Sequence, residues 1–305
     1  MKNKVAFIIP YFGKFPDYFP LFLKSIEGQA FDILLFSDNE NPAPEIKNLH
    51  THKVSFNTVK QLISDRLQCP VDFNSGYKLC DFKPMYGVIF EEYLAPYHFW
   101  GTIDIDTIVG NFAEFLPDEI LDTIDFYSGI REYVSGSFFI VRNNEKCNNL
   151  FKRSRDWQQV VTNPQHVSFD ECGGHYYEDL RAGKSIFELN TKIQSFTEVV
   201  LAEEKAGNIR ALFTSSILEP KGMQPVTIQK NKVLYGDAEY LMIHFIYYKT
   251  KYYFYTKTNI NTTPYYICSL GIFKYRPTLF NVLFSINFRA ALLKKAGNVI
   301  RKITK

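Results

Sequence analysis

The chain of 305 residues is poor in cysteine, and its five cysteines form no C-x-x-C pair. An odd number of widely spaced thiols excludes a zinc ribbon and argues against a disulfide framework, so we expect reduced thiols in a cytosol. No run of 18 apolar residues occurs, and the sequence therefore predicts no membrane-spanning helix. The apolar run at residues 5–9 ends at Pro10 and is too short for the apolar core of a signal peptide.

Acidic residues are missing from the last part of the chain. Residues 240–305 hold 11 Lys and Arg and no Asp or Glu, whereas residues 1–239 hold 24 basic and 32 acidic residues. Apolar residues at helical spacing over residues 279–293, with basic residues among and after them, predict a basic amphipathic helix. Such a tail can contact an anionic membrane, a nucleic acid or its own acidic body. We expect the membrane surface and no nucleic acid, because no nucleic-acid-binding motif accompanies the charge.

The overall amino-acid composition is that of a globular protein with a large core. Hydrophobic residues make up 46% and charged residues 22%, which excludes wholesale disorder. The first forty residues have the pattern of a βαβ unit: an apolar strand at 5–9, a helix at 19–26 and a second apolar strand at 33–36. A βαβ unit predicts a parallel sheet.

Further elements follow the same rules of periodicity. We expect strands at residues 99–103, 126–130, 138–141 and 241–245, helices at 59–67, 85–94, 145–160 and 198–206, and irregular chain at 39–50 and 170–185. The sequence thus predicts an α/β fold with a Rossmann-like, mostly parallel central sheet flanked by helices.

Two carboxylates one residue apart, Asp104 and Asp106, follow the expected strand at 99–103. At the carboxyl end of such a strand, where ligands usually bind, they can hold Mn²⁺ or Mg²⁺, which keeps water or substrate phosphates as its other ligands. The alternative is a pair of solvated loop aspartates.

His244 and Lys249 come about 140 residues later. An imidazole can complete an oxygen-rich Mn²⁺ site, and a lysine can meet a phosphate as a point charge. Because His244 lies in an apolar run, a structural core histidine is the alternative.

Three blocks carry a resemblance to a known group of enzymes. They are I-I-P-Y-F-G at residues 8–13, Y-K-L-C-D-F-K-P at 77–84 and W-G-T-I-D-I-D at 100–106. Together they resemble GT-A glycosyltransferases that use nucleotide sugars, in particular an uncharacterised bacterial family from polysaccharide loci, over residues 5–250. The resemblance implies a GT-A catalytic domain at residues 1–255 and a basic aromatic extension with the amphipathic helix at 256–305.

The resemblance also implies site roles. Asp106 would bind the metal directly, Asp104 through water or the ribose, and His244 would complete the metal site. Residues at the ends of the first two strands would hold uracil and ribose, and those of the 77–84 block would contact the sugar or diphosphate. The donor-binding residues would be Pro10, Tyr11, Phe12, Asp38, Lys78, Asp81, Lys83, Asp104 and Lys249.

Two of these carboxylates have an alternative reading from local chemistry. Asp38 can equally cap a turn, and Asp81 can cap the helix that begins at Pro84.

More distant retaining families place a small-residue strand and then an acidic pair after the D-x-D motif. Residues 135–139 would be the strand, and Asp170 and Glu171 the catalytic pair. In an inverting enzyme one of the pair would deprotonate the acceptor hydroxyl, and in a retaining enzyme it would orient the donor. A retaining outcome is favoured, and the inverting one stays open.

The late segment departs from the H-x-x-G-x-x-K pattern of those families. Tyr247 stands in place of the glycine, so the lysine that meets the diphosphate is either Lys249 or Lys251. His175, Trp157 and the tyrosine-rich residues 247–255 either form an acceptor platform or belong to the core.

The resemblance implies a metal-dependent hexosyltransferase. It would move galactose or glucose from a UDP-sugar to a bacterial O-antigen, lipopolysaccharide or capsule glycan, on a free or lipid-linked acceptor, in the cytoplasm at the inner membrane. One alternative is a non-catalytic nucleotide-sugar-binding module. Another is a haloacid-dehalogenase-type phosphatase, because D-I-D-T-I nearly matches D-x-D-x-[TV], with Ile108 at the fifth place.

Overall fold

The computed structural model describes residues 1–39, 45–251, 254 and 263–278. The chain divides into two compact units. Unit 1 comprises Met1–Phe15, Glu27–Asp104 and Phe112–Ser215, and unit 2 comprises Pro16–Ile26, Ile105–Asn111 and Ser216–Lys305. In the described part, no helix is long and apolar enough to cross a membrane. The amphipathic helix expected at 279–293 lies outside the described residues.

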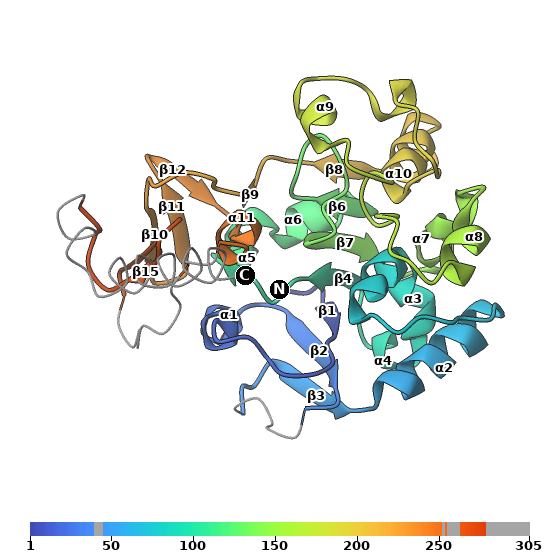
Figure 1. The fold of residues 1–305 in the computed structure, drawn as a ribbon, viewed down its shortest axis with the longest axis horizontal. Helices are drawn as coiled ribbons and strands as arrows, with labels where there is room; N and C mark the ends of the chain where they lie inside the picture. The colour runs from blue at the N-terminus through green and yellow to red at the C-terminus, as the bar shows by residue number, and fades with distance from the viewer. Residues whose placement is uncertain (40–44, 252–253, 255–262, 279–305) are drawn as a thin grey trace, which may run out of the picture. The chain divides into compact units, whose positions relative to one another are not determined.

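Unit 1 is built on a seven-stranded sheet with the order β3-β2-β1-β4-β7-β6-β8 (Figure 1). Its strands are β1 (Val5–Pro10), β2 (Asp32–Ser37), β3 (Leu49–Lys53), β4 (Phe99–Ile103), β6 (Phe126–Ser128), β7 (Phe138–Arg142) and β8 (Ala211–Phe213). Neighbouring strands pair in parallel except where β7 pairs with β4 and with β6. The prediction of an α/β fold with a mostly parallel central sheet is therefore confirmed.

The central strands of this sheet are buried on both faces, which explains their continuous apolar runs; these strands are β1, β2, β4, β6 and β7. Successive side chains of a strand point to opposite faces, so Ala6 and Ile8 join the large core cluster on one face. On the other face Phe7 contacts the rings of Phe31 and Phe112. The sheet is a rigid base whose strand ends can carry functional groups.

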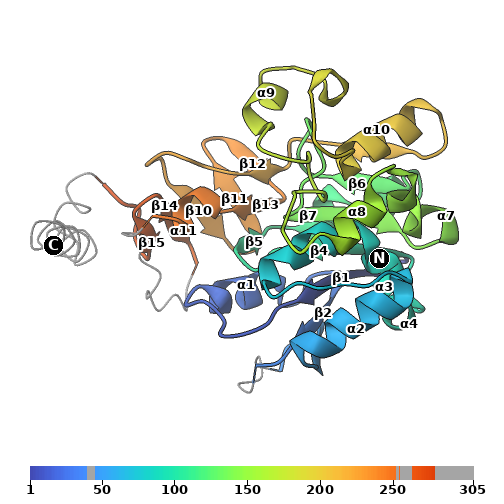
Figure 2. The same ribbon diagram turned by 45° about the vertical axis from the view of Figure 1, so that its right-hand side comes forward.

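Helices of unit 1 cover the sheet, and α2, α3 and α4 lie together beside it in both views (Figures 1 and 2). The helices are α2 (Phe56–Leu67), η1 (Gly76–Met85), α3 (Tyr86–Ile89), α4 (Glu91–Leu94), α5 (Phe112–Phe115), α6 (Asp118–Leu121), α7 (Glu145–Asn148), η2 (Leu150–Arg153), α8 (Trp157–Thr162), α9 (Tyr177–Arg181), η3 (Ile186–Glu188) and α10 (Phe196–Lys205).

Two expected helices are broken into short pieces. The expected helix at 85–94 is divided at Phe90, whose φ of −107° and ψ of 24° are not helical, and it is preceded by the 3₁₀ helix η1, which contains Pro84. The expected helix at 145–160 is interrupted at Ser154, which is extended and donates its hydroxyl to the carbonyl of Gln194 at 2.7 Å. Tertiary contacts have overridden local helical periodicity at both places.

Two segments expected to be irregular contain regular structure. Residues 39–50 run into β3, which pairs in parallel with β2 at the edge of the sheet, and residues 170–185 contain α9. β3 has the polar sequence L-H-T-H-K. Because it lies at the edge of the sheet it needs few apolar residues, and its sequence therefore gave no strand signal.

Unit 2 contains two small sheets and a core of its own. A three-stranded sheet has the order β5-β13-β9, and a five-stranded antiparallel sheet has the order β12-β11-β10-β14-β15. The elements are α1 (Phe19–Ile26), β5 (Thr107–Val109), β9 (Ile217–Leu218), β10 (Val226–Gln229), β11 (Lys232–Tyr235), β12 (Ala238–Tyr240), β13 (Met242–His244), α11 (Ile246–Lys249), β14 (Tyr265–Cys268) and β15 (Gly271–Phe273). The expected domain boundary between residues 255 and 256 stays a prediction, although β10 and β14 on its two sides pair in one sheet.

Candidate functional site

The carboxyl ends of β1 and β2 meet at one edge of the unit 1 sheet because the two strands are parallel. The Tyr11 amide donates to the carbonyl of Phe36, and the Gly13 amide donates to Asp38 Oδ1 at 2.8 Å. Asp38 thus caps the turn after β1, as the local alternative expected, and the exposed carboxylate brings residues 10–12 and residue 38 together. Contact of these residues with uracil and ribose stays a prediction.

Asp104 follows the neighbouring strand β4 and is held by Lys83. Lys83 Nζ lies 2.6 Å from Asp104 Oδ1 and donates to the carbonyl of Gly136 at 2.8 Å. Burial opposes the charged ammonium, but Asp104 and Asp170 outweigh it and hold the pKa of Lys83 well above its usual value. Lys83 therefore stays charged and neutralises part of the negative charge at this edge.

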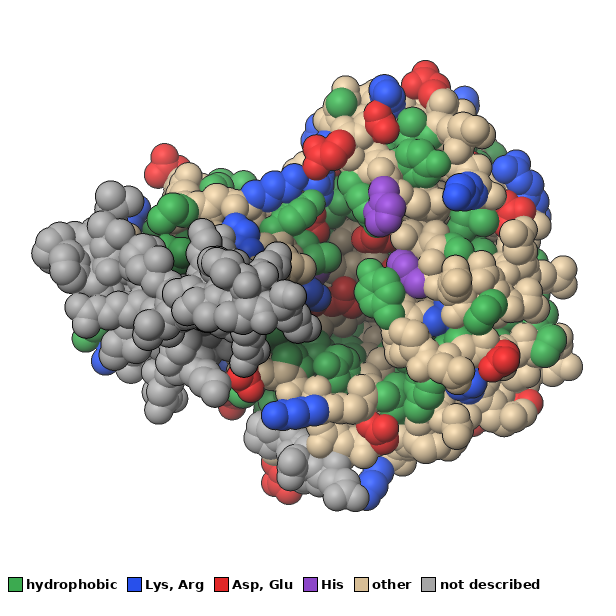
Figure 3. All heavy atoms as spheres, viewed as in Figure 1, with side chains coloured by type: hydrophobic (Ala, Val, Ile, Leu, Met, Phe, Trp, Pro, Cys, Tyr) green, Lys and Arg blue, Asp and Glu red, His purple; other side chains and the backbone are tan. Residues whose placement is uncertain are grey.

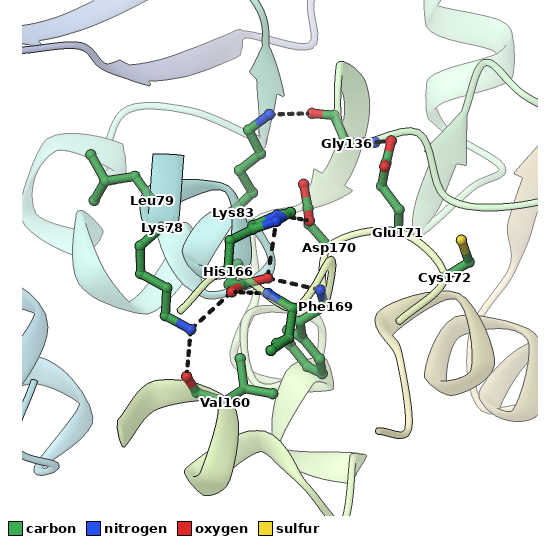
Figure 4. Close-up of polar contacts among 12 residues, drawn as sticks. Lys78, Leu79, Lys83, Gly136, Val160, His166, Phe169, Asp170, Glu171 and Cys172 are labelled. Carbon is green, nitrogen blue, oxygen red and sulfur yellow. Dashed lines mark hydrogen bonds and ion pairs between the residues drawn. The ribbon is translucent and has the colours of Figure 1, made fainter. Parts of the chain in front are cut away.

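Lys78 and Asp81 form an ion pair that is fully buried, with both side chains 0% exposed. Lys78 Nζ donates to the carbonyl of Val160 (Figure 4), and it also donates to Asp81 Oδ2 at 2.8 Å and to the carbonyl of Gln165. An ammonium has three protons, and all three are used here. This placement favours a structural role for Lys78 over the expected donor contact.

Asp81 also holds the segment that leads to the acidic pair. Its carboxylate accepts from the amides of Val167 and Phe169 at 2.9 and 2.8 Å. The Asp81 carboxylate thus binds a distant segment of the chain and does not cap a helix at Pro84, and the donor contact expected of Asp81 stays a prediction. The 77–84 block and the segment before Asp170 are thereby joined.

The acidic pair lies against residues 135–137. Residues 135–137 precede β7 and do not form part of it, so the strand expected over 135–139 begins later, at Phe138. Gly136 donates its amide to Glu171 Oε1 at 3.1 Å, and a Cβ at this position would lie 2.3 Å from Asp170 Oδ2 (Figure 4). A larger residue at position 136 would therefore displace the Asp170 carboxylate.

The charges of the acidic pair are unfavourable in this environment. Burial raises the pKa of Asp170. Burial and the neighbouring Asp170 raise the pKa of Glu171 to about 7. The Tyr177 hydroxyl, which donates to Glu171 Oε2 at 2.5 Å, lowers this pKa but does not outweigh them. A carboxyl group with a pKa near neutrality can exchange a proton at working pH, which suits general acid–base work.

Glu171 should make the stability of the protein fall as pH rises. Its pKa is about 7 in the folded chain and 4.5 in the unfolded chain, so its stabilising contribution is complete below pH 4.5 and is lost as pH rises through 7. We expect the melting temperature of Glu171→Gln to fall less between pH 5 and pH 8 than that of the wild type. The exposed Glu204→Gln in α10 is the control, and an equal fall in Glu171→Gln and wild type would contradict the assignment.

A second constellation lies wholly within unit 2, where β5 pairs antiparallel with β13. The register places Thr107 opposite His244, and the Phe245 amide donates to the carbonyl of Asp106. His244 Nε2 lies 3.1 Å from Asp106 Oδ2, and Lys249 Nζ lies 2.6 Å from the same oxygen. The backbone pairing thus brings together two residues that are 138 positions apart.

Glu219, which follows β9, completes this constellation. Its Oε1 lies 2.8 Å from His244 Nδ1, on the side of the ring opposite Asp106. Burial alone would lower the pKa of His244, but Asp106 and Glu219 raise it to about 10. Burial would raise the pKa of Asp106, but His244 and Lys249 hold it well below its usual value. Asp106 and His244 are therefore a buried charged pair, with Glu219 half-buried on one side and Lys249 exposed on the other.

The chemistry of this donor set fits a divalent cation. The Asp106 carboxylate faces His244 Nε2, and the Glu219 carboxylate faces His244 Nδ1. A carboxylate at the second ring nitrogen is the usual partner of a metal-binding histidine. Asp104 ends unit 1 only two residues before Asp106, and the chain itself keeps the two Cα atoms within about 7 Å. Lys249 rather than Lys251 reaches Asp106, whereas Lys251 Nζ contacts the carbonyl of Lys221.

Several functional candidates had no clear sequence signal. No motif includes Glu219 or Tyr177. Only their contacts, with His244 and Glu171 respectively, identify them. His166 had a weak signal, since it lies four residues before Asp170. Its Nε2 is 3.6 Å from Asp81 Oδ1 and 3.8 Å from Asp170 Oδ1.

The expected aromatic platform is divided between surface and core. His175 is exposed, whereas Trp157 packs edge-on against Phe151 and Tyr248 is buried in the core of unit 2. Three of the tyrosines in the run, at positions 252, 253 and 255, lie outside the described residues. Trp157 and Tyr248 therefore follow the core alternative.

Comparisons with known proteins give a family and similarities to solved structures. No curated protein matches the chain. Among solved structures, the crystal structure of the galactosyltransferase LgtC in complex with donor and acceptor sugar analogs is 15% identical, with a TM-score of 0.34, over 56% of this chain and 72% of that chain. Residues 7–276 match the family of unknown function DUF6625, and the chain belongs to this family.

Proposed function

We propose that the protein is a metal-dependent glycosyltransferase that moves a hexose, galactose or glucose, from a UDP-sugar to a bacterial surface glycan. The observation that carries the proposal is the cluster of Asp106, His244, Glu219 and Lys249 in unit 2. The Asp106 carboxylate and the His244 imidazole, which contacts Glu219 through its other nitrogen, could bind a cation. Lys249 beside them could bind a diphosphate, which is the leaving group of a nucleotide sugar.

Asp104, Asp106 and His244 would hold Mn²⁺ or Mg²⁺. Bound there, the cation would neutralise negative charge that develops on the leaving diphosphate. Lys249 lies beside Asp106 and would present its ammonium to a phosphate oxygen. Pro10, Tyr11, Phe12 and Asp38 at the ends of β1 and β2 would bind uracil and ribose.

Asp170 and Glu171 would act at the sugar. In transfer, the bond between the anomeric carbon and the diphosphate oxygen breaks, and a bond from that carbon to the acceptor oxygen forms. In a retaining reaction, which we favour, the leaving phosphate takes the acceptor proton and the acidic pair orients the donor. In an inverting reaction Glu171, with its pKa of about 7, would take that proton.

The setting of the reaction is also part of the proposal. A polysaccharide locus, an O-antigen, lipopolysaccharide or capsule acceptor and a cytoplasmic location at the inner membrane follow from the family resemblance. The membrane contact would come from the basic tail, whose amphipathic helix at residues 279–293 lies outside the described residues.

A donor screen tests the function. Purified protein with Mn²⁺ is expected to release UDP from UDP-galactose or UDP-glucose, faster with an acceptor sugar, and NMR of the product gives its anomeric configuration. Nucleotide-sugar binding without turnover of any donor would favour the binding module. Phosphate release from a simple phosphate ester without a sugar acceptor would favour the phosphatase.

A further inference from the structure

Tyr77 is exposed, but its backbone belongs to a segment of unit 1 that buried contacts hold in place. Its neighbours in the chain, Lys78 and Asp81, are 0% exposed and bind the backbone of residues 160–169 through two carbonyls and two amides. A side chain on such a base loses little conformational freedom when a ligand binds, because its backbone is already fixed.

Anchoring places Tyr77 against His166. The two ring centroids are 4.4 Å apart with an interplanar angle of 57°. Tyr77 is nevertheless 66% exposed, which is unusual for a large ring in contact with another ring. On the face drawn in Figure 3, histidine, acidic and hydrophobic side chains come to the surface close together between the places of α9 and α3.

The two rings adjoin the acidic pair. His166 Nε2 faces Asp170 Oδ1 at 3.8 Å, too far for a hydrogen bond (Figure 4). The Asp170 side chain is 5% exposed, and within the described residues its Oδ1 has no hydrogen-bond partner. Partial burial of the Tyr77 hydroxyl, the neighbouring Cys80 and the charges of Asp170 and Glu171 raise the pKa of Tyr77 to about 12.

These features match the surface of a hexopyranose. One face of a pyranose ring carries C–H groups that pack on an aromatic ring, and its rim carries hydroxyls that need acceptors. Tyr77 offers an exposed aromatic face, and Asp170 offers a buried carboxylate oxygen that still lacks a donor. A buried carboxylate oxygen without a hydrogen-bond donor is costly, and a sugar hydroxyl would satisfy it.

We propose that Tyr77, His166 and Asp170 form a hexopyranose-binding subsite in unit 1, with Tyr77 as its aromatic platform. The subsite deepens the proposed glycosyltransferase function and rests on it for its biological meaning. The sugar bound there is either the hexose of the donor or a hexose of the acceptor, and both have the chemistry that the subsite recognises.

The test measures saccharide binding directly, without relying on transfer. Saturation-transfer NMR on the full chain, with Mn²⁺ present, compares methyl galactoside and methyl glucoside as acceptor-like probes with UDP-galactose, UDP-glucose and UDP. The variants are Tyr77→Ala, Tyr77→Phe and, as a matched exposed tyrosine in unit 2, Tyr275→Ala, whose side chain is 72% exposed. Tyr77 is exposed, so its truncation should leave the melting temperature unchanged.

We expect Tyr77→Ala to weaken hexose binding about tenfold, and Tyr77→Phe and Tyr275→Ala to change it less than about threefold. A loss for the methyl glycosides assigns the subsite to the acceptor, and a loss for UDP-sugars relative to UDP assigns it to the donor.

Equal hexose binding by Tyr77→Ala and the wild type, or no hexose binding by the wild type, overturns the subsite. UDP binding in the same samples separates the two proposals. If the wild type binds UDP with Mn²⁺ but Tyr77→Ala changes no sugar affinity, the subsite fails and the transferase proposal stands. If the wild type does not bind UDP, the transferase proposal fails whatever the methyl glycosides show.

Discussion

Replacing Asp106 by Asn is expected to lower sugar transfer about a thousandfold while the fold is kept. The substitution keeps the size of the side chain and removes the charge that faces both His244 Nε2 and Lys249 Nζ. If Asp106 holds the cation at the diphosphate, this loss removes stabilisation that develops mainly in the transition state. The effect should therefore appear in kcat, measured as UDP release under saturating donor.

The matched control for this variant is Asp237→Asn in the same unit. Asp237 is exposed in the turn between β11 and β12, and its substitution should leave transfer within about twofold of the wild type. Folding is checked by the melting temperature of each variant. Wild-type turnover in a folded Asp106→Asn protein would refute the role of Asp106.

The second large effect is expected from Gly136→Ala. An alanine Cβ would lie 2.3 Å from Asp170 Oδ2 and 3.1 Å from Glu171 Cγ, so the acidic pair must move. A displacement of about 1 Å at a group that orients a reacting sugar costs about a hundredfold in rate. We expect Gly136→Ala to lower kcat by that factor, with a smaller change in affinity for UDP, measured by calorimetry.

Gly222→Ala is the control for added volume. A Cβ at Gly222 would meet nothing within 4 Å, so we expect activity and stability close to those of the wild type. If Gly136→Ala and Gly222→Ala are equally active, the position of the acidic pair does not matter for transfer, and its proposed role is wrong.

The parts of the fold that the sequence predicted well are those set by local pattern. The spans of β4 (Phe99–Ile103) and α1 (Phe19–Ile26) agree with the expected ranges, and β1 extends one residue further, to Pro10. A buried parallel strand is an unbroken apolar run, and a surface helix repeats its apolar residues every three or four positions. Such signals do not depend on the rest of the chain.

The elements that were missed depend on distant partners. The 3₁₀ helix η1 is fixed by Lys78 and Asp81, whose partners lie more than 80 residues away. Strands β8 to β12 are short, with two to four residues each, and exist because they pair in sheets. No local pattern distinguishes them from loops, because pairing supplies most of their stability.

The candidate sites show the same division. The position of Asp106 after a strand end and the family resemblance led us to expect Asp106 and His244 at one cation site, although the residues around His244 equally suited a core histidine. The sequence could not show that Glu219 lies behind His244 or that His166 faces Asp170, because nothing in the intervening residues fixes those distances.

The central claim is that Asp106 and His244 bind a divalent cation, and Mn²⁺ binding measured by electron paramagnetic resonance tests it most directly. With UDP present, the wild type is expected to take up one Mn²⁺ per chain, and Asp106→Asn and His244→Ala are expected to leave most of it free. The account would be contradicted if the wild type left the Mn²⁺ free, or if both variants bound it as tightly as the wild type.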